Sequence, residues 1–141
     1  MRESIVVLIS VYKSDNPEHL KLAFDSILNQ TFEDIKVLIG VDGSVGEKLG
    51  RTIFEYETNP KVKISWFPDN RGLTAVLNDL LSEAKQMNPS FIARMDADDI
   101  SKLDRFEKQV RFLEQNQEVD VVGGAIEEME FTGELNGKVI N

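Results

Sequence analysis

The sequence predicts an α/β fold whose central sheet is mostly parallel. Two short apolar runs, 5–9 and 37–41, have the composition of strands that are buried on both faces of a sheet. Apolar residues recur at helical spacing between and after these runs, and regular alternation of strands and helices is typical of a parallel sheet covered by helices. Turn-forming residues follow several strands, and folds of this class bind ligands at the carboxyl ends of their strands.

The first helix has a clear start signal, because Asn16 and Pro17 supply an N-cap and a first-turn proline. Its apolar stripe consists of Leu20, Ala23, Phe24, Ile27 and Leu28. A weaker helix follows the second strand and ends before Asn59-Pro60. The apolar residues of this weaker helix are Leu49, Ile53, Phe54 and Tyr56.

The third strand, 62–66, alternates apolar with polar residues, which predicts a half-exposed strand near an edge of the sheet. The clearest helical stripe in the chain follows it and consists of Leu73, Val76, Leu77, Leu80, Leu81 and Ala84. A fourth strand, 91–95, then leads into Asp96-Ala97-Asp98-Asp99. Because Arg94 lies within this strand, we expect it to be buried beside a carboxylate.

The last part of the chain predicts one more helix and one more strand. Leu103, Phe106, Val110 and Leu113 have helical spacing, and Ser101 with Asp104 fits a capping box for this helix. Val119, Val121 and Val122 predict a fifth strand that ends at Gly123-Gly124. The tail from Thr132 onward is rich in turn-forming residues, and no element is predicted there.

Length and composition limit the classes of protein to which the chain can belong. With 141 residues, it fits a single domain, 1–141. The net charge of −9 argues against a nucleic-acid-binding surface, so no nucleic acid is expected as a partner. The absence of cysteine excludes disulfides and thiolate metal sites. An anionic substrate stays compatible with this charge, because a bound metal ion can reconcile carboxylates with phosphates.

The acidic cluster Asp96, Asp98 and Asp99 is the most informative group of residues. Carboxylates this close repel one another, and a divalent cation removes that penalty. Oxygen ligands suit Mg²⁺ or Mn²⁺, and Mg²⁺ is usually held by one or two carboxylates plus substrate phosphates. An acidic loop between a strand and a helix is also common, and Asp99 could merely interact with the dipole of the next helix. From the residues alone, both interpretations stay open.

Other motifs are absent or ambiguous. The context excludes an EF-hand, a glycine-rich dinucleotide site, a P-loop and an aspartyl phosphatase of the haloacid dehalogenase type. Asn70-Arg71-Gly72 could hold a phosphate before a helix, or could form a turn with a solvated arginine. Tyr12 could stack on a base or simply pack at the rim of the sheet.

Taken together and in chain order, several segments resemble the family 2 glycosyltransferases. The matching segments are 9–12, 26–32, 42–44, 70–75 with Asn78, 93–101, 105–109 and 119–123. The resemblance implies a GT-A (Rossmann-like) three-layer sandwich with a mostly parallel central sheet. It also implies a nucleotide-diphosphate sugar donor, most often UDP-linked, inversion at the anomeric carbon, and Mn²⁺ or Mg²⁺ as cofactor.

The resemblance also assigns expected roles to residues of this chain. Nucleoside-pocket residues would be Ser10, Val11, Tyr12 and Asp42, with Arg71 close to that pocket. Asp96 would approach the ribose, with Ala97 beside it, and Asp98 would hold the metal and the diphosphate. Asp99 matches the pattern with a less settled role. The acceptor would be a glycan or a lipid-linked sugar in the assembly of a bacterial surface polysaccharide, in the cytoplasm at the inner face of the membrane.

The chain departs from the family pattern in two ways. Val41 stands where the family usually has a first aspartate of the second-strand turn, and Val45-Gly46 replaces the common Thr-Asp. The family's general base lies on a later segment, so we expect it beyond residue 141, and we expect this chain to bind the donor without transferring sugar alone. Two alternatives stay open: a non-catalytic nucleotide-binding or interaction module, and a metal-dependent phosphatase or nucleotidyltransferase.

Overall fold

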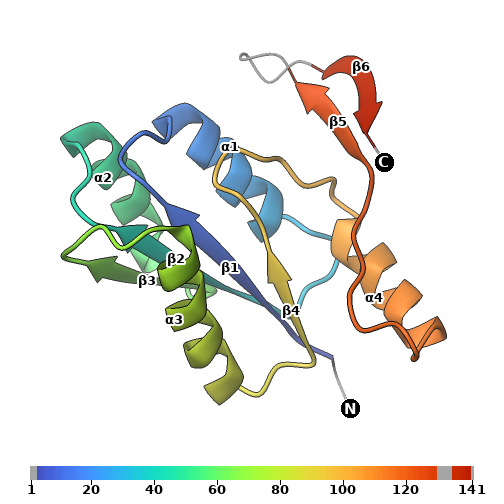
Figure 1. Ribbon diagram of the computed structural model, residues 1–141. Coiled ribbons are helices and arrows are strands. Elements are labelled where there is room, and N and C mark those ends of the chain that lie inside the picture. Colours follow the sequence, from blue (N-terminus) through green and yellow to red (C-terminus); the bar gives the residue numbers. More distant parts are fainter. Residues whose placement is uncertain (1–2, 130–134, 141) are drawn as a thin grey trace.

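The structure is a computed structural model that describes residues 3–129 and 135–140. Its main sheet has four parallel strands in the order β3-β2-β1-β4 (Figure 1). These strands are β1 (Ile5–Val11), β2 (Ile35–Asp42), β3 (Val62–Phe67) and β4 (Phe91–Arg94). A separate antiparallel pair consists of β5 (Ile126–Met129) and β6 (Leu135–Ile140). The predicted parallel α/β sheet is confirmed.

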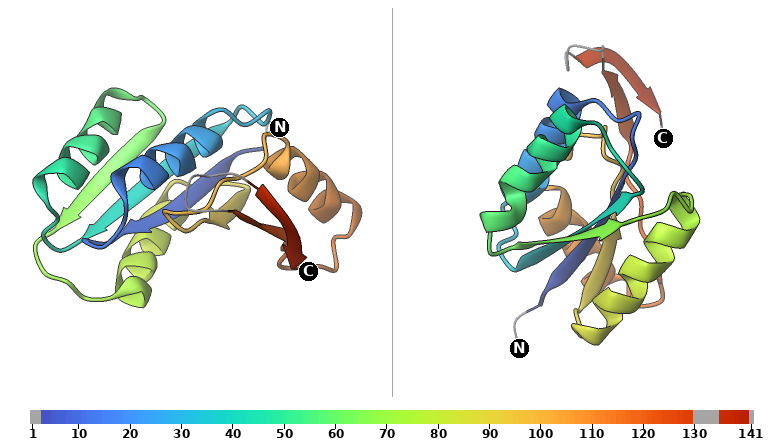
Figure 2. Two further views of the ribbon diagram at one scale, coloured as in Figure 1. Left: turned by 90° about the horizontal axis from the view of Figure 1, so that it is seen from above. Right: turned by 90° about the vertical axis from the view of Figure 1, so that its left-hand side faces the viewer.

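Helices cover both faces of the main sheet. The helical elements are α1 (Pro17–Leu28), α2 (Glu47–Phe54), the short 3₁₀ helix η1 (Glu55–Thr58), α3 (Leu73–Gln86) and α4 (Arg105–Gln115). Helices α1 and α2 lie on one face and α3 lies on the other, which gives three layers (Figure 2). The expected three-layer sandwich is therefore present. Among the described residues, we find no helix with the length and apolar character needed to cross a bilayer.

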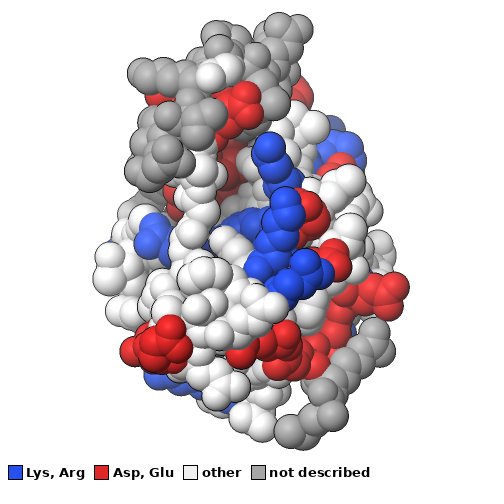
Figure 3. Space-filling view, turned by 90° about the vertical axis from the view of Figure 1, so that its right-hand side faces the viewer, with Lys and Arg blue, Asp and Glu red and all other residues white. Residues whose placement is uncertain are grey.

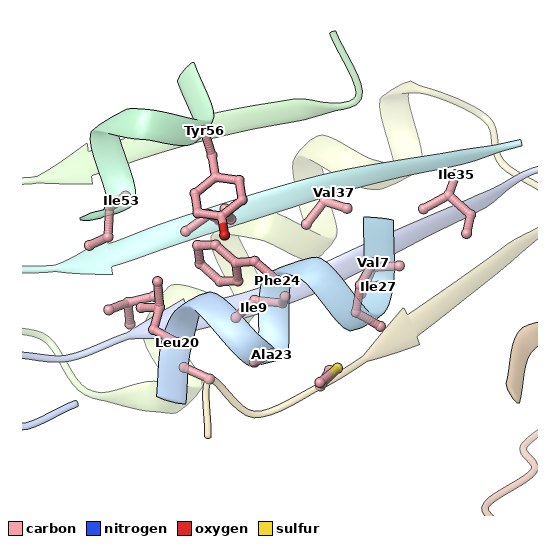
Figure 4. Close-up of a cluster of buried hydrophobic side chains, with 14 of the residues drawn as sticks. Val7, Ile9, Leu20, Ala23, Phe24, Ile27, Ile35, Val37, Ile53 and Tyr56 are labelled. Atoms are coloured by element: carbon pink, nitrogen blue, oxygen red, sulfur yellow. The ribbon is translucent and has the colours of Figure 1, made fainter. Parts of the chain in front are cut away.

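Strand β1 is buried on both faces, which explains its continuous apolar composition. Val7 and Ile9 point into the larger core, where they pack with Phe24 and other side chains of α1 (Figure 4). The intervening residues Val6 and Leu8 belong to the smaller core under α3. Helix α1, whose buried side chains lie in the larger core, begins after Asn16 as predicted. The Asn16 Oδ1 accepts the first-turn N–H groups of residues 18 and 19 at 2.9 and 3.1 Å.

The strand order brings three loops to one edge of the sheet. Strands β2 and β3 lie on one side of β1, and β4 lies on the other side. Ser10 of β1 is in register with Gly40 of β2, and Leu8 is in register with Arg94 at the end of β4. Because these strands are parallel, their carboxyl ends and the loops that follow them meet at the same edge.

Two predictions near β4 need correction. Arg94 is exposed rather than buried, because β4 is the edge strand of this sheet within the described residues. It does have the expected carboxylate neighbour, because its Nη2 lies 3.7 Å from Asp96 Oδ1. Ser101 and Asp104 do not form a capping box: α4 begins at Arg105, and its N-cap residue Asp104 makes no side-chain cap hydrogen bond. The Ser101 hydroxyl instead accepts from the Arg105 guanidinium at 2.9 Å and donates to Met95 Sδ at 3.3 Å.

The end of the described chain also differs from the prediction. Residues 119–122 do not form the predicted strand, and Val121 is 85% exposed. A strand needs a neighbouring strand to complete its hydrogen bonds, and this segment has none among the described residues. Conversely, β6 forms where no element was predicted, paired with β5. The turn-rich residues 132–134 lie outside the described residues.

Candidate functional site

A cleft of about 510 Å³ lies at the carboxyl ends of β1, β2 and β4 and against the start of α3. Its lining residues are Ser10, Tyr12, Asp15, Asp42, Asn70, Gly72, Leu73, Arg94, Asp96, Ala97 and Asp98. The cleft is therefore built where a parallel sheet of this topology usually binds its ligand.

Residues that were expected to act together separate into two groups. Six of them line the cleft: Ser10, Tyr12, Asp42, Asp96, Ala97 and Asp98. The other three, Val11, Arg71 and Asp99, are not among its lining residues. Val11 is fully buried in the core. The Arg71 guanidinium pairs with Asp79 of α3 and lies 4.8 Å from the centre of the Phe67 ring.

Two lining residues near the start of α1 are joined by a tight turn. The Asp15 Oδ2 accepts a hydrogen bond from the Tyr12 N–H at 2.8 Å, and the Asp15 N–H donates to the Tyr12 carbonyl at 3.0 Å. Asp15 was not expected in the site. The turn composition Ser14-Asp15-Asn16 before a helix was the signal that could have drawn attention to it.

Asp42 fixes the loop that opens into α3. Its carboxylate is buried, and it accepts the backbone N–H of Arg71 at 2.7 Å and that of Gly72 at 3.0 Å. The next residue, Gly43, has a φ of +81°, and a Cβ there would stand 2.9 Å from the Asn70 backbone nitrogen. The aspartate–glycine turn therefore ties β2 to the far wall of the cleft, which explains why Asn70 and Gly72 line it.

The segment after β4 alternates between core and cleft. Met95 and Ala97 are each only 5% exposed and pack in the core, where Ala97 also reaches the cleft, whereas Asp96 and Asp98 are exposed and line the cleft. Met95 N–H donates to the Leu8 carbonyl at 3.2 Å, so the strand-like course continues past the end of β4. This alternation places two carboxylates that are two residues apart on the same side of the chain.

Asp96, Asp98 and Asp99 form a compact acidic cluster, with one carboxylate oxygen from each lying within 4.8 Å of the others. Partial burial and then repulsion from Asp98 and Asp96 raise the pKa of Asp99. Burial also raises the pKa of Asp15, which Asp98 and Asp96 raise further while the hydrogen bond from the Tyr12 N–H opposes the shift. Four carboxylates thus share one region of negative potential.

The oxygen donors of the acidic cluster suit a small divalent cation. An octahedral Mg²⁺ holds oxygens at about 2.1 Å, so neighbouring ligands stand about 3 Å apart and opposite ligands about 4.2 Å apart. One oxygen from each of the three carboxylates lies within 4.8 Å of the others, so the three would have to move closer together to bind one ion. The cluster also has a neighbouring cation, because Arg94 Nη2 lies 3.7 Å from Asp96 Oδ1.

Residues 6–137 match the sequence model of glycosyl transferase family 2. The chain belongs to this family. An uncharacterized glycosyltransferase of Haemophilus influenzae is 39% identical over 122 residues, which cover 86% of this chain and 45% of that protein. The UDP-Gal:alpha-D-GlcNAc-diphosphoundecaprenol beta-1,3-galactosyltransferase of Escherichia coli is 32% identical over 125 residues, which cover 89% of this chain and 44% of that protein.

A solved mannosyltransferase structure shows the same fold. The mannosyltransferase PcManGT from Pyrobaculum calidifontis, determined in complex with GDP-Man and Mn²⁺, superposes with a TM-score of 0.68 at 19% identity. The match covers 89% of this chain and 35% of that one. The fold of the chain is therefore of the GT-A type. In each of these comparisons the chain spans less than half the length of its relative, 45%, 44% and 35%.

Val41, one of the positions at which this chain departs from the expected family pattern, is a core position. Val41 is fully buried and lies in register with Val11 of β1 and Trp66 of β3. Its side chain therefore packs in the larger core and offers no polar group to the cleft. Asp42, the next residue, is the carboxylate that β2 presents at the cleft.

Proposed function

We propose that this chain binds the nucleotide-diphosphate part of a sugar donor, with Mn²⁺ or Mg²⁺ held by the acidic cluster, as part of an inverting glycosyltransferase. The observation that carries the proposal is the acidic cluster itself, whose three carboxylate oxygens lie within 4.8 Å of one another. Two of its members line a cleft at the strand ends. A diphosphate brought into such a negative region needs a cation to bridge it to the carboxylates.

Each side of the cleft suits a different part of the donor. Tyr12, 38% exposed at the rim, offers an aromatic face to the base, and Ser10 precedes it by two residues in β1. After the neighbouring strand β4, Asp96 approaches the ribose and Asp98 holds the metal and the diphosphate, while Asp99 completes the cluster. A metal at this place supplies Lewis-acid stabilisation of the departing diphosphate.

The remaining expected residues act less directly in this proposal. Ala97 is a nearly buried part of the cleft lining, Val11 supports the end of β1 from the core, and Asp42 acts through the amides of the loop that it holds. Arg71 would reach an anionic ligand only after leaving its pair with Asp79. Arg94, the one cationic side chain among the cleft-lining residues of the described chain, is the nearer candidate for contact with phosphate.

The names of the relatives support the finer parts of the proposal. The Escherichia coli relative is named for a UDP-galactose donor and a lipid-linked sugar acceptor, and the Pyrobaculum relative binds a GDP-sugar together with Mn²⁺. We therefore propose a UDP-sugar as donor and a glycan or lipid-linked sugar as acceptor, in polysaccharide assembly at the inner face of the cytoplasmic membrane. The general base and the acceptor site would lie on a segment that follows the donor-binding part.

Titration calorimetry with UDP, with and without Mn²⁺, tests this proposal. We expect Mn²⁺ to tighten UDP binding roughly tenfold or more, which corresponds to about 1.4 kcal/mol per factor of ten. Asp98→Asn keeps the shape of the side chain but removes its charge, so it should abolish the gain from Mn²⁺. Asp120→Asn, at an exposed position outside the cleft, is the matched control and should behave like the unmodified chain.

Other outcomes would favour the alternatives. If UDP, GDP and dTDP all fail to bind with or without Mn²⁺, the chain is an interaction module rather than a donor-binding domain. Steady release of phosphate or pyrophosphate without any acceptor would instead indicate a phosphatase or nucleotidyltransferase.

A further inference from the structure

The two ends of the acidic segment are joined by one side chain from α4. Arg105, the first residue of that helix, donates from Nη1 to Ser101 Oγ at 2.9 Å and from Nη2 to the Arg94 carbonyl at 3.2 Å. Arg94 ends β4 before the acidic cluster, and Ser101 follows the cluster. A single guanidinium therefore spans the base of the loop formed by residues 95–100.

The Arg105 guanidinium is itself held in place. Its Nε donates to Gln109 Oε1 at 3.2 Å, and its central carbon lies 4.9 Å from the centre of the Phe106 ring. Phe106 is only 1% exposed, so this ring forms a fixed surface. Burial lowers the pKa of Arg105, while the nearby Asp99 carboxylate raises it, so the guanidinium lies within the field of the acidic cluster.

The end of α1 holds the same segment from the other side. Gln30 is buried; its Nε2 donates to the Lys102 carbonyl at 2.6 Å and its Oε1 accepts the Phe106 N–H at 3.1 Å. The Ser101 N–H donates to Ser26 Oγ at 3.0 Å, and both serines are buried. Residues 101–106 are thus attached to a core helix, and Arg105 carries that attachment back to the end of β4.

We propose that Arg105 is a positioning residue for the metal site: by joining the Arg94 carbonyl to Ser101, it keeps the three carboxylates of the acidic cluster close together. Carboxylates at this spacing repel one another, so an unrestrained loop would open to separate them. Ordering that loop again when the cation binds would cost conformational entropy and weaken the affinity. This role rests on the proposed function, because it presumes that the acidic cluster binds a cation.

The test compares Arg105→Met and Arg105→Lys with Arg111→Met, a matched control. Arg111 lies on the same helix, is exposed, and pairs with Glu107 rather than with the acidic segment. Mn²⁺ affinity is measured by electron paramagnetic resonance, and amide hydrogen exchange is measured at Met95, Asp99 and Ser101, whose N–H groups are hydrogen-bonded. Exchange at the central strand residue Val7 reports on the fold as a whole.

We expect Arg105→Met to raise the Kd for Mn²⁺ roughly tenfold, which corresponds to about 1.4 kcal/mol. The exchange of the amides of Met95, Asp99 and Ser101 should become faster by a similar factor. Val7 should exchange as before. Arg105→Lys should recover only part of the affinity, because an ammonium lacks the planar fork that reaches both acceptors. Arg111→Met should match the unmodified chain in both measurements.

Equal Mn²⁺ affinity and equal loop exchange in Arg105→Met and Arg111→Met would overturn the inference and leave the proposed metal site standing. If the unmodified chain does not bind Mn²⁺, both the proposed metal site and the role of Arg105 in it are overturned. The amide exchange of Arg105→Met would then show only whether Arg105 orders the segment. Should Arg105→Met fail to fold, Ser101→Ala removes one of the two acceptors and is expected to give a smaller change in the same direction.

Discussion

Tyr12 is a large aromatic side chain left 38% exposed at the rim of the cleft. Its backbone is fixed by the turn with Asp15, whose carboxylate accepts the Tyr12 N–H at 2.8 Å. Lys13 Nζ lies over the ring, 5.8 Å from its centre. The backbone of Tyr12 is therefore held in place while much of its ring stays exposed, as suits a platform for a base.

We predict that Tyr12→Ala weakens UDP binding roughly 5- to 150-fold, because stacking of one base on an aromatic ring contributes about 1–3 kcal/mol. Tyr12→Phe keeps the ring and should bind UDP nearly as well as the unmodified chain. Calorimetric titration in the presence of Mn²⁺ measures both. Unchanged affinity in Tyr12→Ala would show that the base binds elsewhere.

At this scale the sequence predicted part of the site for clear reasons. Asp96 and Asp98 could be predicted because they form a compact acidic motif directly after a buried strand, and both line the cleft. Asp15 was missed because its place depends on a turn formed only in the fold. The direction of Arg71 also could not be predicted, since Asp79, eight positions further along the chain, decides where its guanidinium points.

Among the elements, β2 and α3 pack closely at Gly40. A Cβ added at Gly40 would lie 2.5 Å from Val76 Cγ1 and 3.3 Å from Leu80 Cδ1, both in the core of the α3 layer. Only glycine lets the helix approach the strand to this distance. The position of α3 matters for the site, because the residues just before it form one wall of the cleft.

We predict that Gly40→Ala lowers the free energy of unfolding by about 1–3 kcal/mol, the usual effect of overpacking. Gly50→Ala is the matched control: Gly50 lies inside α2, and an added Cβ would meet only Val45 Cγ2 at 3.7 Å. Alanine there should stabilise the chain by roughly 0.5–1 kcal/mol. Urea unfolding of both variants gives the two values, and changes of the same sign would contradict the packing argument.

The short helix η1 is joined to α1 by a buried phenol. Tyr56 Oη donates to Asp25 Oδ1 at 2.8 Å, and its ring packs edge-on against Phe24 at 4.9 Å between ring centres. Burial, followed by the hydrogen bond to Asp25, raises the pKa of Tyr56 above its usual value. The neutral phenol is therefore favoured in the folded chain relative to the unfolded chain.

Because the folded pKa is the higher one, the contribution of Tyr56 to stability is fully present below the unfolded pKa of about 10 and is lost as the pH rises above it. We predict that the free energy of unfolding falls more between about pH 8 and pH 11 in the unmodified chain than in Tyr56→Phe. At neutral pH this variant should lose about 0.5–1.5 kcal/mol through the missing hydrogen bond. Urea unfolding at the two pH values measures the difference, and parallel pH profiles would contradict it.

The elements that the sequence predicted well have strong local signals. Strand β1 could be predicted from an apolar run buried on both faces, and α1 from the Asn16 cap. The expected strand at 119–122 is absent because its valines lack a neighbouring strand in the described part of the chain. The pairing of β5 with β6 is a contact between separate segments, which composition alone does not specify.

For the molecule as a whole, the net charge of −9 is unevenly distributed. On the side where α4 lies, Lys and Arg side chains gather in a central group with Asp and Glu around them (Figure 3). The cleft, in contrast, is lined by four aspartates and one arginine. An anionic donor therefore gains little from the chain's own field, and a bound cation would have to reverse the local potential.

The central claim is that the cleft at the strand ends binds the metal together with the nucleotide. At 16.0 kDa the chain suits two-dimensional amide NMR, in which bound Mn²⁺ broadens the signals of nearby amides. Titration of Mn²⁺ in the presence of UDP should first broaden the amides of Tyr12, Gly72 and residues 96–99, and should spare Gly50 of α2 and Met87 after α3. Broadening that begins at other acidic positions and leaves residues 96–99 sharp would contradict the account.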